Sequence, residues 1–277
     1  MNHLSPHKIR HFQKEVLAFY ALNRREMPWR TPEANGTYNP YKILLSEVML
    51  QQTQVARVTA KYAEFLQAFP GVEELAGAEL SDVLRIWSGL GYNRRAKFLW
   101  QAARQIVDMY HGHIPLDVGL LQELPGIGRN TAAAICVYAA ETPVAFIETN
   151  IRTVFLNAFF HDEEKVTDAQ ILELVQETLP KKGVRDWYYA LMDLGAHYKA
   201  TTGNPNKRST SYARQKAFKG SVRQIRGIIL KTLTKTAASF EELENIVKDQ
   251  RLENVLGELV KERLIHSRKA KYYLGEK

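Results

Sequence analysis

The sequence contains one cysteine, Cys136, within the apolar run AAAICVYAA. A single thiol excludes an intramolecular disulfide and any site that needs several thiolates, so we interpret Cys136 as a small buried hydrophobic residue. No N-terminal apolar segment resembles a signal peptide, and no apolar run approaches membrane-spanning length. His3, His7 and His11 recur every four residues, but no carboxylate completes a metal-binding pattern. We expect a protein of a reducing interior, without a membrane partner or a metal site.

Acidic residues are absent from a long stretch between Asp193 and Glu241. The 277-residue chain has a net charge of +8, and removing the ten positive charges of this stretch leaves −2 for the rest. Interleaved aromatic residues make the stretch typical of a surface that follows phosphates, although a solvated basic linker remains the alternative. The ten cations are Lys199, Lys207, Arg208, Arg214, Lys216, Lys219, Arg223, Arg226, Lys231 and Lys235.

Apolar residues recur at intervals of three and four along most of the chain, and few segments alternate with a period of two. This pattern predicts a nearly all-α fold with short turns. The helical pattern covers residues 9–20, 41–69, 80–87, 96–110, 118–124, 131–140, 151–160, 171–179 and 187–198.

The pattern changes from residue 221 onward. Two amphipathic segments follow one another, and Ser239 is suited to cap the second, which carries Phe240 and Leu243. A third segment is centred on Leu256, and HSRKAKYYL then has the alternation of a β-hairpin. Three helices and a hairpin predict a winged-helix-like domain over residues 221–277, which could bind DNA or another protein.

The segment SEVMLQQTQV places Glu47 in apolar surroundings. At helical spacing Glu47 lies between Ile43 and Leu50, outside the main apolar face, so we expect a partly desolvated carboxylate. Desolvation favours the protonated form, which suits a general acid near neutral pH. A surface glutamate on a helix is the alternative. The main apolar face comprises Leu44, Leu45, Val48, Met49 and Val55.

A second motif, LPGIGRNTAAAI, places a glycine-containing turn between two helices. Gly126 and Gly128 permit a tight turn, and the free N–H groups at the start of the next helix suit a phosphate oxygen. This is the helix-hairpin-helix pattern. Arg129 and Thr131 lie in the same stretch, and Glu148 follows in PVAFIETNIRTV, after an apolar run and before a new helix.

These motifs together resemble a known family. SEVMLQQTQV, GLGYNRRA, LPGIGRNTA, FIETNIRTV and LMDLGA occur in the order and spacing of the helix-hairpin-helix (HhH-GPD) DNA glycosylases, with the nearest likeness to the MutY-type adenine DNA glycosylases. The resemblance covers about residues 25–200. It implies a two-lobed core over residues 1–220 with an active-site cleft between the lobes. One lobe spans residues 30–140, and the other combines residues 1–29 with 141–220.

The resemblance implies roles for two carboxylates. Glu47 would protonate N7 of a flipped-out adenine, and Glu148 would stabilise the oxocarbenium-like sugar, which is the logic of paired acids in glycoside hydrolysis. Around the base it implies contacts from Gln51, Gln52, Tyr92, Asn130 and Asn150. It implies phosphate contacts from Gly126, Gly128, Arg129, Thr131, Lys207 and Arg208.

Three features of the chain depart from the family pattern. Most members have Asp where this chain has Glu148, and the added methylene moves the carboxylate by about 1 Å. Most members also have four cysteines after LMDLGA that bind an iron-sulfur cluster, whereas this chain has none there, so we expect no cluster and no other cofactor. The domain that reads 8-oxoguanine is not recognisable, and the winged-helix-like segment occupies its place.

We therefore expect a monomeric base excision repair enzyme that hydrolyses the N-glycosidic bond of adenine in mismatched or 8-oxoguanine-containing duplex DNA. Asn130 stands where lyase-competent relatives have a lysine, which indicates a monofunctional enzyme. In a prokaryote the protein would be cytoplasmic and nucleoid-associated. A thymine or uracil mismatch glycosylase and a non-catalytic DNA damage-binding protein are the alternatives.

Overall fold

The computed structural model describes residues 3–213, 215 and 217–277. Arg214 and Lys216 of the predicted basic stretch lie outside these residues. The chain forms two compact units, and one helix, α2, contributes to both. The first unit comprises Met1–Ile43, Leu116–Gln122 and Gly128–Arg214, and the second comprises Leu44–Pro115, Glu123–Ile127 and Gln215–Lys277. Among the described residues, no helix combines the length and the apolar character that crossing a bilayer requires.

The predicted helical fold is confirmed. The first unit holds α1 (Pro6–Asn23), α7 (Val118–Gln122), α8 (Arg129–Ala140), α9 (Thr149–Phe159), α10 (Asp168–Thr178) and α11 (Val184–Thr201), with short 3₁₀ helices η1 (Pro28–Arg30) and η2 (Pro205–Arg208). The second unit holds α3 (Val55–Ala68), α4 (Val72–Gly77), α5 (Leu80–Trp87), α6 (Arg94–Tyr110), α12 (Val222–Leu233), α13 (Phe240–Val247) and α14 (Leu252–Lys261). Helix α2 spans Pro40–Leu50.

Local signals start several of these helices. Ser5 caps α1 and is followed by Pro6, which needs no N–H partner at the first helical position. Thr167 and Gln170 form a reciprocal capping box at α10, and Ser239 and Glu242 form another at α13. The predicted cap at Ser239 is therefore confirmed.

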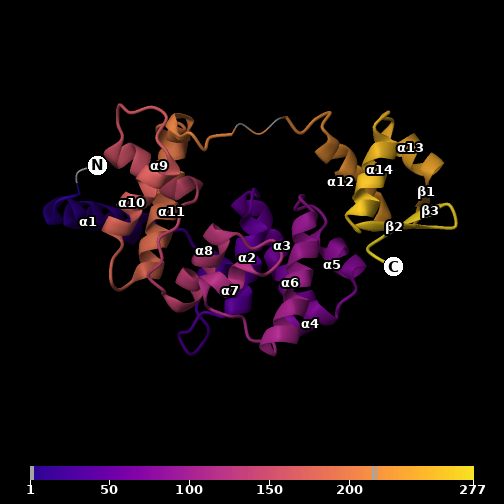
Figure 1. Ribbon diagram of the computed structural model, residues 1–277, viewed down its shortest axis with the longest axis horizontal. Helices are drawn as coiled ribbons and strands as arrows, with labels where there is room; N and C mark the ends of the chain where they lie inside the picture. Colours follow the sequence, from indigo (N-terminus) through magenta and orange to yellow (C-terminus); the bar gives the residue numbers. More distant parts are fainter. Residues whose placement is uncertain (1–2, 214, 216) are drawn as a thin grey trace. The chain divides into compact units, whose positions relative to one another are not determined.

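Aromatic packing forms the centre of the first unit. Phe12 of α1 makes edge contacts with Phe155 and Phe159 of α9 and with Trp187 of α11, at ring-centroid distances of 5.4, 4.9 and 5.7 Å. Helices α1, α9 and α11 lie side by side around this cluster (Figure 1). Gly195 of α11 allows a close approach, since a Cβ there would lie 2.2 Å from the carbonyl oxygen of Asn150.

The second unit has its own core. Phe65 of α3 contacts Phe69 and the fully buried Trp87 of α5 through edge-on rings. Helices α4 and α5 pack on α6. The C-terminal segment, drawn in orange and yellow in Figure 1, adds a three-stranded antiparallel sheet to α12–α14. Its strands are β1 (Ala238–Ser239), β2 (Ile265–Arg268) and β3 (Lys271–Leu274), in the order β1-β3-β2. The predicted hairpin is present in HSRKAKYYL.

One helix prediction was wrong, and one short helix was not predicted. The pattern over residues 41–69 predicted one continuous helix, but residues 51–54 form a turn between α2 and α3. Gln52 has a left-handed φ of 56°, which an α-helix cannot continue through. Val55 therefore belongs to α3 and does not share the apolar face of α2. Helix α4, only six residues long, was too short to give a periodic signal.

A buried carboxylate ties the N-terminal segment to α11. Asp193 is 1% exposed at its side chain and accepts hydrogen bonds from the Arg25 guanidinium at 2.7 Å and from Arg30 at 2.9 and 3.0 Å. The Arg25 backbone N–H also donates to it, at 2.8 Å. Removing one partner of a buried ion pair leaves an uncompensated charge. Arg25 and Arg30 therefore depend on this carboxylate for their counter-charge.

Asp193→Asn should lower the free energy of unfolding by about 3 kcal/mol, because Arg30 would stay buried without its counter-charge. Urea unfolding followed by circular dichroism measures this change. Asp82→Asn is the matched control, since the Asp82–Arg85 pair is about half exposed and such pairs contribute about 0–1 kcal/mol. Equal losses in the two variants would contradict the structural role of Asp193.

Candidate active site

Glu47 lies in the last turns of α2 and is partly exposed. Its helical neighbour Ile43 is 2% exposed, and Val48 and Met49 beside it are 3% and 0% exposed. Leu50, the other predicted neighbour, is partly exposed. The helix is thus apolar around Glu47 and leaves part of that side chain open to solvent. The carboxyl group of Glu47 is therefore accessible to a bound molecule.

The turn after α2 carries Gln51 and Gln52. The Thr53 N–H donates to the Leu50 carbonyl at 3.2 Å, which closes the turn. Gln52 is exposed and Gln51 is partly exposed. A left-handed backbone at a non-glycine residue such as Gln52 is uncommon and often accompanies a functional constraint.

Tyr92 follows the glycine-rich loop between α5 and α6. Gly89 and Gly91 have φ values of +101° and +75°, and Tyr92 itself has a left-handed φ of 47°. Its hydroxyl group accepts hydrogen bonds from Arg223, at 3.0 Å, and from Gln215. The loop therefore holds a partly exposed aromatic side chain in an uncommon backbone conformation.

Arg95, which the sequence analysis missed, joins these two segments. Its guanidinium donates to the carbonyl oxygens of Val48 and Met49 at 2.8 and 2.9 Å, to Thr53 Oγ1 at 2.9 Å and to the Gly91 carbonyl at 3.2 Å. The residue is only 9% exposed. The second arginine of GLGYNRRA was the available signal, but nothing in the sequence indicates which of Arg94 and Arg95 is buried.

The predicted helix-hairpin-helix turn has the hydrogen bond of a tight turn, from the Ile127 N–H to the Leu124 carbonyl at 3.2 Å. Gly126 has a φ of +78°, and a Cβ there would lie 2.7 Å from Phe98 Cβ, so only glycine fits. Gly128 begins α8 without a side-chain cap. Arg129 and Asn130 are exposed at this helix start, and Thr131 is partly exposed. Free N–H groups with a cation beside them suit a phosphate oxygen.

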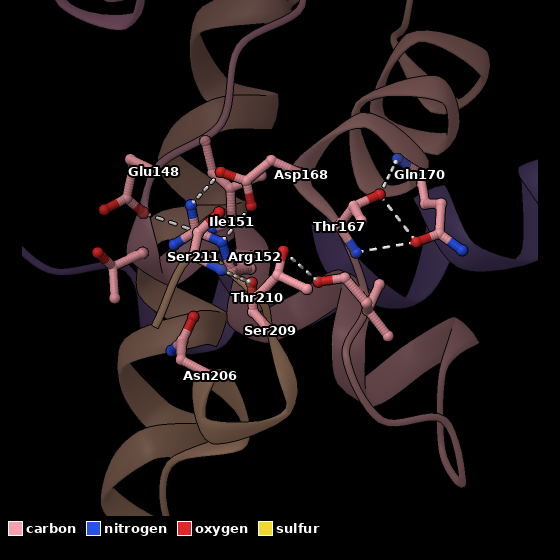
Figure 2. Close-up of polar contacts among 12 residues, drawn as sticks. Glu148, Ile151, Arg152, Thr167, Asp168, Gln170, Asn206, Ser209, Thr210 and Ser211 are labelled. Carbon is pink, nitrogen blue, oxygen red and sulfur yellow. Dashed lines mark hydrogen bonds and ion pairs between the residues drawn. The ribbon is translucent and has the colours of Figure 1, made fainter. Parts of the chain in front are cut away.

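Glu148 is the N-cap of α9. Its Oε1 accepts hydrogen bonds from the N–H groups of Asn150 and Ile151 at 2.5 and 2.9 Å. The second carboxylate oxygen points away from the helix start (Figure 2) and accepts a hydrogen bond from Asn150 Nδ2 at 3.4 Å. Burial raises the pKa of Glu148 above the usual value, while the two N–H groups, Lys199 and Arg152 oppose that shift. One oxygen is fixed and the other is directed outward.

Asn150 lies between Glu148 and α11. Its amide nitrogen is 3.9 Å from the sulfur of Met192, and its buried Oδ1 has no hydrogen-bond partner among the described residues. The close approach of Gly195 brings the start of α9 against α11. The structure thus places Glu148 and Asn150 together at the start of α9, with one buried acceptor of Asn150 unpaired among the described residues.

The two basic residues of η2 have different surroundings. Lys207 is exposed. Arg208 donates to the carbonyl oxygens of His161 at 2.7 Å, Leu156 at 3.1 Å and Phe160, so its guanidinium satisfies the C-terminal end of α9. The phosphate contact predicted for Arg208 has to compete with these bonds, and it stays a prediction.

Hydrogen bonds fix the segment that follows α11. Asn206 Nδ2 donates to Thr153 Oγ1 at 2.7 Å, and Val166 pairs with Ser209 in an isolated parallel bridge. An iron-sulfur cluster in this segment would need four cysteine thiolates. The chain has one cysteine, Cys136, which is buried in α8. The residues of this chain do not fit a four-thiolate cluster.

Comparison with known proteins gives consistent results. Residues 45–181 match the model of the HhH-GPD superfamily of base excision DNA repair proteins. The adenine DNA glycosylase of Mycolicibacterium smegmatis is 34% identical over 236 residues, covering 79% of each chain. That of Mus musculus is 36% identical over 192 residues, covering 67% of this chain and 37% of the mouse protein.

A solved thermostable thymine-DNA glycosylase has the same core fold, with a TM-score of 0.62 and 27% identity over 69% of this chain and 87% of that one. The chain spans little more than a third of the mouse protein but most of the mycobacterial relative. Because the chain resembles these proteins in both sequence and fold, it belongs to the HhH-GPD superfamily of base excision DNA repair proteins.

Proposed function

We propose that the protein is a monofunctional DNA glycosylase that removes adenine from mismatched or 8-oxoguanine-containing duplex DNA. Similarity to adenine DNA glycosylases over 79% of the chain supports this activity. The observation that carries the mechanism is the unlike surroundings of its two carboxylates. Glu47 lies on an apolar helix surface, whereas Glu148 is held by backbone N–H groups at a helix start.

Glu47 acts as the general acid. Adenine offers N7 as a proton acceptor, and protonation there lets the base leave as a neutral molecule when the bond between N9 and C1′ breaks. A positioned acid contributes about 10²–10⁴-fold to such a step. Thymine and uracil have no N7, so a pyrimidine substrate would make less use of this acid.

Glu148 stabilises the positive charge that develops on the sugar. It must be ionised to do so, and the N–H groups of Asn150 and Ile151 favour the ionised form against burial. Water then adds to C1′, and its proton passes to Glu148 or to solvent. The longer side chain of Glu148 still accepts the N-cap hydrogen bonds from Asn150 and Ile151.

A second candidate function is the release of thymine opposite guanine. The likeness to a thymine-DNA glycosylase at a TM-score of 0.62 supports it. We rank it second, because the mycobacterial adenine DNA glycosylases are 33–34% identical to this chain and the thymine-DNA glycosylase is 27% identical, and because Glu47 suits a purine leaving group.

The proposed substrate predicts the following result. In single-turnover reactions with duplexes that carry each mismatch, adenine opposite 8-oxoguanine or guanine should be released faster than thymine or uracil opposite guanine. Strand breaks should appear only after alkali, because Asn130 cannot form a Schiff base.

Glu47→Gln should reduce base release by about 10² or more, with duplex binding retained.

The exposed Glu79 provides a matched control, and Glu79→Gln should leave the rate unchanged. Faster thymine release would favour the second candidate. Tight binding without release from any duplex would refute the enzymatic proposal.

A pH profile tests the role of Glu148. The folded protein raises the pKa of this carboxyl group, so base release should fall on the acid side at a pH above the ordinary range of glutamate, about 4.3. Lys199 opposes that shift. In Lys199→Met, the acid limb measured at saturating duplex should therefore move to higher pH. Lys14→Met, which removes an exposed positive charge of the same unit, should leave the limb in place. An unmoved limb in Lys199→Met would count against Glu148 as the titrating group.

The raised pKa of Glu148 also affects stability, with a pH dependence opposite to that of base release. A carboxyl group whose pKa is raised by folding favours the fold in its protonated form, and that contribution is lost as pH rises through the folded pKa. Asp168, whose pKa Arg152 lowers, has the opposite dependence. Its contribution is present above the unfolded pKa and is lost as pH falls through the folded pKa.

Lys207 and Arg208 should behave differently in DNA binding. Lys207→Ala should weaken binding to all duplexes and flatten the salt dependence by about 0.9 units of log–log slope, the value for one phosphate contact. Arg208→Ala should chiefly lower the midpoint of thermal unfolding, because three carbonyl oxygens in and just beyond the last turn of α9 lose their donor. Fluorescence anisotropy at several salt concentrations measures binding. An unchanged slope for Lys207→Ala would mean that this side chain is merely solvated.

A further inference from the structure

Arg95 is a buried cation whose described hydrogen-bond partners include no carboxylate. All four acceptors are neutral oxygens, three of them backbone carbonyls. Burial without a counter-charge lowers its pKa to about 10, so the folded chain meets an energetic cost to keep a cation here. Apolar residues of similar volume often replace buried charges without loss of stability. Filling space is therefore a poor explanation for an arginine at this position.

The acceptors belong to two segments that carry predicted site residues. Val48 and Met49 directly follow Glu47 in α2, and Thr53 directly follows Gln52. Gly91 directly precedes Tyr92, and its carbonyl also accepts from Trp87 Nε1 at 3.0 Å. One guanidinium thus spans the end of the helix that bears Glu47, the glutamine turn and the tyrosine loop.

Two uncommon backbone conformations lie beside these hydrogen bonds. Gln52 and Tyr92 have left-handed φ values of 56° and 47°, and each adjoins a residue that Arg95 holds. Such conformations are unfavourable and persist only where the surroundings determine them. The planar guanidinium, with several donors in fixed directions, can hold both segments, whereas an ammonium group cannot match that geometry.

We propose that Arg95 is the positioning residue that sets Glu47, the Gln51–Gln52 turn and Tyr92 in one arrangement for base extrusion and protonation. This inference rests on the proposed function. Arg95 acts through the residues it holds and not through contact with the base. A displacement of about 1 Å in such groups can reduce a rate by about 100-fold.

Arg95→Lys tests the proposal with the charge retained. Single-turnover release of adenine at saturating duplex should fall by about 10–100-fold, while the dissociation constant for the duplex changes by less than about threefold. Arg94→Lys is the matched control, because Arg94 is the exposed neighbour that lies over the Phe98 ring, and it should keep the wild-type rate. Circular dichroism verifies that both variants are folded at the assay temperature.

Base extrusion provides a readout that a general loss of stability does not change. A duplex with 2-aminopurine at the target position becomes fluorescent when the base leaves the stack, and Arg95→Lys should show less of this increase than wild type at saturation. Thr53→Val removes one acceptor without touching the cation and should show a smaller loss of the same kind. It replaces Arg95→Lys if that variant does not fold.

The outcomes separate the two proposals. Absence of base release by the wild-type protein refutes the proposed function, and the fluorescence comparison then still tests Arg95. An active wild type with unchanged rate and fluorescence in Arg95→Lys overturns the positioning role. A loss of binding in proportion to the loss of rate also overturns it, because Arg95 would then contribute to affinity rather than to geometry.

Discussion

Short helices leave backbone N–H and carbonyl groups without partners at both ends, and this protein depends on charged side chains to satisfy them. Glu148 accepts from the first N–H groups of α9, and Arg208 donates to the last carbonyls of the same helix. Arg95 does the same at the end of α2, and Arg185 at the end of α8. Glu148 directly precedes the helix that it caps, whereas the three arginines come from distant parts of the sequence, so each of their caps also fixes one element against another.

The capping arrangement explains why the predicted site residues lie where chains turn. A glutamate that caps a helix has one oxygen occupied and the other directed outward, as in Glu148. The helix dipole and the N–H groups favour its charged form, whereas burial opposes it. The same residue therefore contributes to the fold and directs its second carboxylate oxygen away from the helix start. This dual use has a cost, because an ionised, buried carboxylate lowers stability at neutral pH.

Residues with unfavourable backbone angles or a buried charge lie beside the predicted site residues. Gln52 and Tyr92 adopt left-handed backbone angles, and Arg95 keeps a charge away from water. A chain selected for stability alone would relieve each of these features. Their proximity through the hydrogen bonds of Arg95 is consistent with a site in which precise placement matters more than local stability.

The sequence by itself determined the helical class, the cap at Ser239, the C-terminal hairpin and the family, because periodicity, cap residues and motif spacing are local properties of the chain. It also selected Glu47 and Glu148 as candidates. Only the tertiary structure decided that the helix expected over residues 41–69 breaks after Leu50, since left-handed angles leave no mark in apolar spacing. It also decided that Arg95 is buried while Arg94 is exposed, and that Arg208 caps a helix while Lys207 is open to solvent. Neighbouring residues of equal charge look alike in sequence, and their roles differ because the acceptors they meet come from other segments of the fold.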